Sequence, residues 1–124
     1  MNKLKLFLII LFSQFLNSQS IIGAWEKYET NSDGSTHRYV AIFIEGFKST
    51  SVFDSSSGKF ISTNGGSWFL DGSTLTEKIE FDTQDQEKVG SHIKVEFDIK
   101  ENTITNINSG KTWNKIDDGS PGQL

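Results

Sequence analysis

The sequence has no cysteine and only one proline among its 124 residues, and both features limit what the protein can be. Without cysteine it forms neither a disulfide nor a thiolate nucleophile, and a lipid anchor on a cysteine is excluded as well. The folded domain must therefore be held together by packing alone. The single proline lies in residues 118–124, which we expect to be a flexible tail or the start of a linker.

Basic residues are fewer than acidic ones, 12 against 16, which gives a net charge of −4. Without residues 1–20, which include two lysines, the balance is 10 against 16, or −6. A surface of this sign repels phosphate backbones, so a nucleic-acid partner is not expected.

The patterns of known catalytic and metal sites are also missing. His37 and His92 are the only histidines, and two histidines without cysteine do not make a zinc site. The acidic stretch 82–87 lacks the pattern of a calcium loop. There is no Gly-x-Ser-x-Gly motif and no phosphate-binding glycine loop. We therefore expect no metal, no cofactor and no enzymatic activity.

The longest apolar run stands at the N-terminus. Two lysines precede an apolar stretch at residues 6–16, and small polar residues follow at 17–20. This order is typical of a signal peptide, and the run is too short for a spanning helix of about 20 residues. Cleavage after Ser18 and cleavage after Ser20 both fit. We expect residues 1–20 to be removed, and the rest to be exported to the periplasm or secreted, with no membrane span.

The remaining chain alternates apolar and polar residues with a period of two, which predicts β-strands. Turn signals separate the runs, among them Asp71-Gly72, the strongest short-range cue for a hairpin. Short connections place neighbouring strands side by side and antiparallel, and closing the sheet removes its exposed edges. We therefore predict an all-β, up-and-down barrel of eight antiparallel strands. The expected strands are 22–30, 38–45, 48–54, 59–70, 73–82, 91–100, 102–107 and 111–117.

Three segments carry a resemblance to a known family. They are "IIGAWEKYE" at 21–29, "GGSWFLDGSTLTEKIEF" at 65–81, and "VGSHIKVEFDIKENTITN" with the closing "TWNKID" at 89–117. Together they resemble the short secreted lipocalin-like, or calycin-type, domains common in Bacteroidetes. The resemblance implies a barrel over residues 21–117. Its first-strand tryptophan would be buried at the closed end under a cation from the last strand, which assigns this end to Gly23, Trp25, Trp113 and Lys115.

One residue breaks the alternation. From Leu75, every second side chain gives Leu75, Glu77, Ile79 and Phe81, so that Glu77 lies on the core face. If Asp71-Gly72 is a two-residue turn, Glu77 lies opposite Gly66. A buried carboxylate needs a cation, a proton or water. Glu77 is therefore either the polar floor of a ligand cavity or a structural carboxylate paired with an inward lysine or tyrosine.

These observations favour a protein that binds a small apolar or amphipathic molecule in its barrel. The alternative is a filled barrel that serves as a protein-interaction or envelope-structural module. It would use the apolar outward side of strand 38–47, with Val40, Ile42 and Ile44. The predicted ligand-binding residues are Glu77, Trp68, Gly66, Asn64, Phe81, Tyr39 and Phe43.

Overall fold

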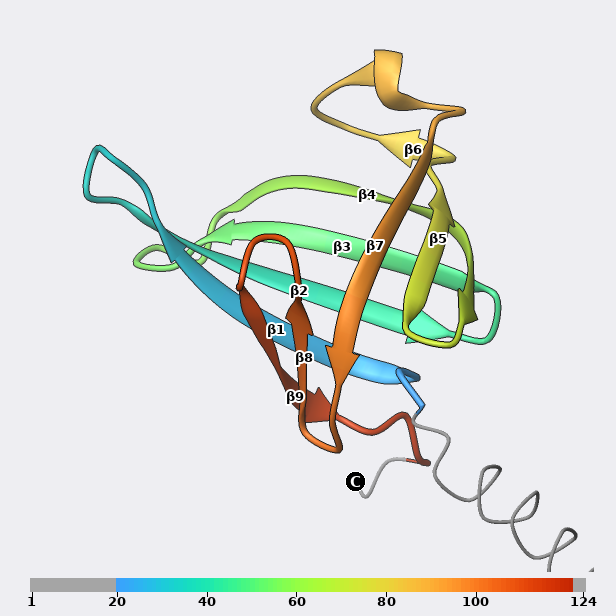
Figure 1. The fold of residues 1–124 in the computed structure, drawn as a ribbon. Helices are drawn as coiled ribbons and strands as arrows, with labels where there is room; N and C mark the ends of the chain where they lie inside the picture. The colour runs from blue at the N-terminus through green and yellow to red at the C-terminus, as the bar shows by residue number, and fades with distance from the viewer. Residues whose placement is uncertain (1–19, 122–124) are drawn as a thin grey trace, which may run out of the picture.

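A computed structural model of the chain describes residues 20–121, and in it one antiparallel sheet closes on itself (Figure 1). Each strand of the barrel pairs with the next one along the chain, except that β5 pairs with β7 past the short β6, and the last strand pairs with the first. Eight strands form the closed barrel, while a ninth, very short strand pairs with Asn64 and Gly65 within β4. The strands are β1 (Gly23–Thr30), β2 (Thr36–Ile44), β3 (Phe47–Asp54), β4 (Phe60–Asp71), β5 (Thr74–Lys78), β6 (Phe81–Asp82), β7 (His92–Ile99), β8 (Thr103–Asn106) and β9 (Thr112–Asp117).

This architecture confirms the predicted all-β, up-and-down barrel. The strands agree with the predicted ranges to within two residues, except that 73–82 is divided into β5 and β6. The predicted signal peptide falls almost wholly on residues 1–19, which lie outside the described residues.

Side chains in the connections explain why the strands end where they do. At four strand ends the last residue is an aspartate or asparagine that accepts a hydrogen bond from the backbone N–H two residues later, so that a local turn takes the place of further strand pairing. These residues are Asp54, Asp82, Asn106 and Asp117.

The closed end of the barrel is built around Trp25. Its side chain is fully buried, and its indole Nε1 donates a hydrogen bond of 3.0 Å to the carbonyl oxygen of Ile21. Lys115 lies opposite on β9, with Nζ 5.0 Å from the centroid of the indole ring. Gly23 has a φ of +126°, and a Cβ there would overlap the carbonyl oxygen of Asp117. Trp25 is therefore buried with a cation from β9 over its ring, and Gly23 lies against the end of that strand.

The register of the β4–β5 hairpin differs from the predicted one. Gly72 and Ser73 form the turn, so Trp68 pairs with Glu77, and Gly66 does not. Gly72 has a φ of +61°, which suits the first central position of a type II′ turn. The pairing slips by two residues, and a slip of two keeps each side chain on its predicted face. Glu77 therefore remains inside the barrel.

An irregularity after β5 reverses the prediction for Phe81. Between the two strands, the Glu80 N–H bonds to the carbonyl oxygen of Gly65, and pairing then resumes one residue out of step. Phe81 consequently pairs with Gly65 and stacks on Phe47 outside the barrel, with 6.4 Å between ring centroids. Asp82 takes the inward position instead. The expectation that Phe81 lines the interior was wrong, because an extra residue in one strand changes the face of all that follow.

Gly66 has a steric role in this irregularity. A Cβ there would overlap the carbonyl oxygen of Lys78, which belongs to rigid backbone. We expect Gly66→Ala to lower the free energy of unfolding by about 1–3 kcal/mol, measured by urea denaturation. Ser67→Ala, one residue further along β4 and exposed, is the control and should change it by less than about 0.5 kcal/mol. Equal losses in the two variants would contradict a close-packing role for Gly66.

Candidate functional site

Above the closed end, the barrel contains a cavity of about 250 Å³. Its lining is divided by chemistry: strands β1 to β4 contribute polar side chains, and most of the apolar ones come from β5, β7 and β9. An adjoining space of about 350 Å³ shares Tyr39, Thr50 and Asn64 with the cavity and continues to His37 and Gln84. The cavity is lined by Lys27, Tyr39, Lys48, Thr50, Asn64, Leu75, Glu77, Ile79, Ile93, Val95, Phe97, Asn106 and Trp113.

An ion pair crosses the cavity wall between β3 and β5. The Nζ of Lys48 donates to Oε2 of Glu77 over 2.8 Å, and the two side chains are 14% and 7% exposed. The same Nζ lies 5.7 Å from the ring centroid of Phe43. Glu77 is therefore paired with an inward lysine, which is the partner that the structural interpretation of this carboxylate required.

The second carboxylate oxygen of Glu77, Oε1, makes no such contact with a cation. Oε1 is buried and has no hydrogen-bond partner among residues 20–121. A buried acceptor left without a partner costs about 1–3 kcal/mol. Glu77 thus lines the cavity with a carboxylate of which one oxygen lacks a hydrogen-bond donor.

Lys27 is a second lysine inside the barrel. Its Nζ lies 4.9 Å from the ring centroid of Tyr39 and 4.7 Å from that of Trp113, and these two rings meet edge to face. Burial lowers the pKa of Lys27 below its usual value, and the charges of Lys111 and Lys48 act in the same direction, against Glu29. Burial likewise raises the pKa of Tyr39, with the charge of Glu29 adding to it.

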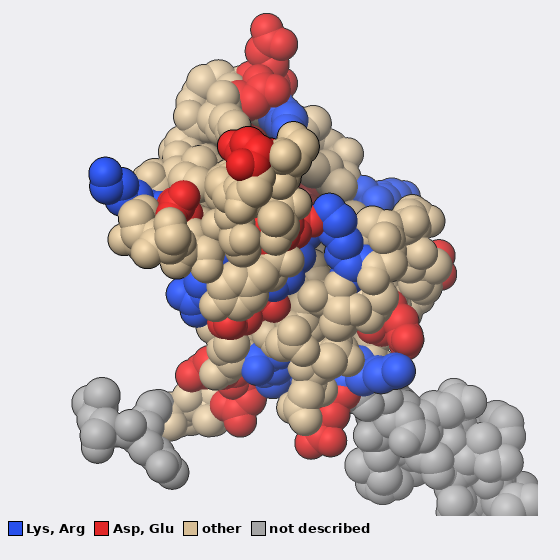
Figure 2. Space-filling model, turned by 90° about the vertical axis from the view of Figure 1, so that its left-hand side faces the viewer, with Lys and Arg blue, Asp and Glu red and all other residues tan. Residues whose placement is uncertain are grey.

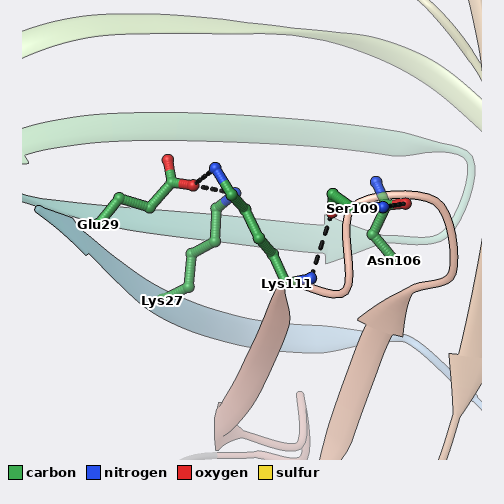
Figure 3. A network of polar contacts seen from close by, with 5 residues as sticks. All are labelled: Lys27, Glu29, Asn106, Ser109 and Lys111. Carbon is green, nitrogen blue, oxygen red and sulfur yellow. Dashed lines mark hydrogen bonds and ion pairs between the residues drawn. The ribbon is translucent and has the colours of Figure 1, made fainter. Parts of the chain in front are cut away.

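Figure 3 shows that Lys27 and Lys111 share one carboxylate oxygen. Lys27 Nζ lies 3.6 Å from Oε1 of Glu29, and Lys111 contacts the same atom. Burial favours the neutral form of Glu29, but the hydrogen bond from Lys111 and the charges of Lys27 and Lys111 outweigh it and hold its pKa below the usual value. In the turn between β8 and β9, Ser109 Oγ accepts from the Lys111 N–H over 3.2 Å and so fixes the backbone of Lys111 (Figure 3).

These charges occupy a gap in the barrel wall. Only Ala24, Trp25 and Glu26 of β1 pair with β9, although β1 continues to Thr30. Beyond Glu26 the wall is completed by side chains around a recess of about 300 Å³. Lys27 lines both the recess and the cavity, whereas Lys111 and Glu29 line the recess. The ion pair between Lys111 and Glu29 therefore bridges the gap between β1 and β9.

The outer surface gives a different picture of charge. Figure 2 shows acidic and basic side chains interspersed over one side of the molecule. The negative net charge is not gathered into one patch on this side, so the ordered ionic contacts of the interior are the more specific feature.

The structure brings together only part of the predicted ligand site. Glu77, Asn64 and Tyr39 line the cavity. Trp68 and Phe43 do not line it: they pack edge to face, 5.3 Å apart, and the Trp68 Nε1 donates to the carbonyl oxygens of Ile44 and Phe47, each over 2.9 Å. Gly66 lies against the irregularity between β5 and β6 described above, and Phe81 directly follows it.

Trp113 was assigned to the closed end, but it lines the cavity, whereas its neighbour Lys115 covers Trp25. Sequence reasoning missed Lys27, Lys48 and Asn106 as lining residues. The signal for Lys27 was present, because it follows Gly23 and Trp25 in the inward alternation of its strand.

Comparisons with protein-family models, with curated proteins and with solved structures find no match for this chain. Within residues 20–121 there is no helix of the length and apolar character needed to cross a membrane. The same residues contain no group of three or more histidine, aspartate or glutamate side chains that could hold a metal ion.

The Lys48–Glu77 pair can be tested by a double-mutant cycle. Lys48→Met leaves the Glu77 carboxylate buried without a cation, and we expect a loss of about 3–5 kcal/mol in the free energy of unfolding. Lys48→Met with Glu77→Leu removes both charges and should recover most of that loss. Lys94→Met, at an exposed position on β7, is the control and should change stability little. Additive losses in the double variant would contradict direct coupling of the two residues.

Proposed function

We propose that the protein is a lipocalin-like binding protein that holds a small amphipathic molecule in its barrel. The observation that carries this proposal is the carboxylate of Glu77: the residue lines the cavity, and its buried Oε1 has no hydrogen-bond partner among the described residues. The closed eight-stranded barrel and the first-strand tryptophan under a last-strand cation support the lipocalin-like part.

The division of the lining suggests how such a molecule would lie. Its apolar body would pack on the β5 and β7 side, against Leu75, Val95 and Phe97, and gain about 25 cal/mol per Å² buried. A hydroxyl or amide N–H would donate to the Glu77 carboxylate and fix the orientation of the molecule. The 250 Å³ cavity is smaller than the roughly 300–1,000 Å³ of sites for drug-sized ligands, which favours a compact molecule.

We also propose that the protein is exported and acts without catalysis. Residues 1–20 support export through their basic, apolar and small-polar order. The ion pair between Glu77 and Lys48 is accounted for by mutual compensation of two buried charges and needs no catalytic role.

A protein contact is a second candidate function, and an apolar strip outside the barrel favours it. Ile44 pairs with Phe47 on the outer face, and they are 59% and 40% exposed. Phe47 in turn stacks on Phe81. The free carboxylate oxygen inside the barrel has no part in this function, so the binding proposal accounts for more of the structure.

A variant that fills the cavity tests the binding proposal. We expect the wild-type protein to bind 2-naphthol, which combines an apolar ring with one hydroxyl, and its fluorescence reports the affinity. Ile93 lines the cavity and is 40% exposed, so Ile93→Trp places a larger side chain at the rim. The variant should weaken binding of 2-naphthol at least about tenfold, because the naphthol ring then buries less apolar surface.

Ile116→Trp is the matched control, because Ile116 is 46% exposed and is not among the cavity-lining residues. It should leave the affinity unchanged. Equal binding by both variants would place the probe outside the barrel and contradict the proposal.

A further inference from the structure

The charged groups around the cavity and its recess are not balanced. Three ammonium groups line them, those of Lys27, Lys48 and Lys111, against the two carboxylates of Glu29 and Glu77. The interior site thus carries an excess of one positive charge, although the whole chain has a net charge of −4. Buried or half-buried charge of one sign is costly unless a partner compensates it.

The excess is located at Lys27. Lys48 has Glu77 as its own partner at 2.8 Å, and Lys111 contacts Oε1 of Glu29. Lys27 reaches only that same oxygen, at 3.6 Å, and otherwise faces the rings of Tyr39 and Trp113. Aromatic faces attract a cation more weakly than a carboxylate does, so the ammonium of Lys27 is compensated least.

We infer that the molecule held in the barrel is an anion, with its acidic group beside Lys27 and a hydroxyl-type donor on Glu77. This inference rests on the proposed binding function and names the chemical class of its ligand. An acidic group at Lys27 would cancel the excess charge, whereas a cation would increase it. Lys27 lines both the cavity and the recess, so the acidic group would lie where the gap between β1 and β9 meets the barrel interior.

The pKa of Lys27 agrees with this assignment. Burial lowers it, and repulsion from Lys111 and Lys48 contributes. An anion beside the ammonium would act in the opposite direction and favour the charged form. The site is thus one in which an anion relieves an existing electrostatic cost.

A matched pair of probes tests the inference. 6-Hydroxy-2-naphthoic acid has a hydroxyl and a carboxylate, and 6-hydroxy-2-naphthamide replaces the carboxylate by a neutral amide of similar shape. At pH 7 the wild-type protein should bind the acid more tightly than the amide, on the order of tenfold. Titration calorimetry gives both dissociation constants, and their ratio is the quantity to compare.

Three substitutions change the interior charge and should move this ratio in a fixed order. Lys27→Met should bring it close to one. Lys111→Met, at a side chain that is 55% exposed, frees Glu29 to pair with Lys27 and should lower the ratio. Glu29→Gln raises the excess charge and should increase the ratio. Lys94→Met, on the outer face of β7, is the control and should leave it unchanged.

The outcomes separate this inference from the binding proposal. If the wild-type protein binds acid and amide equally, or if Lys111→Met and Glu29→Gln move the ratio in the same direction, the anionic ligand class is wrong while barrel binding stands. If neither probe nor 2-naphthol binds, the binding function fails and this inference fails with it.

Discussion

The ion pair between Lys48 and Glu77 is the constraint on which the interior of this barrel depends. An eight-stranded barrel is just wide enough to be filled by side chains or to hold one small ligand, so each inward residue helps decide which occurs. Here two long charged side chains meet across the wall instead of two packed apolar ones. Their polar ends leave a cavity above the core of Trp25, Ala41 and Phe97, and one carboxylate oxygen without a partner.

The remaining interior charges follow from the way the barrel closes. Because β1 and β9 pair over only a few residues, the strands separate above Glu26, and ionic side chains fill the space that a backbone ladder would otherwise occupy. Glu29 joins Lys111 across this gap and leaves Lys27 inside with little compensation. The same few residues therefore complete the barrel wall and determine the charge of the site.

Alternation in the sequence was enough to predict the strands, the closed antiparallel barrel and the inward position of Glu77. It could not predict the partner of Glu77, because the contact with Lys48 joins β3 to β5 across the intervening β4 and depends on the curvature of the closed sheet. Phe81 was misplaced because a one-residue irregularity between β5 and β6 leaves no mark in a two-residue period. Trp113 was assigned to the wrong part of the barrel, because the resemblance implied that its strand contributes to the closed end but did not say how far each residue of the strand lies from that end.

The most direct test is the mass of the protein as its own cell makes it. The protein would be purified from a cell extract, and its native mass spectrum would be compared before and after extraction with organic solvent. A bound molecule in the barrel predicts a mass excess of one small compound that disappears on extraction. An identical mass before and after, with no compound taken up when the extract is added back, would contradict a ligand-binding barrel and leave Glu77 as a structural carboxylate.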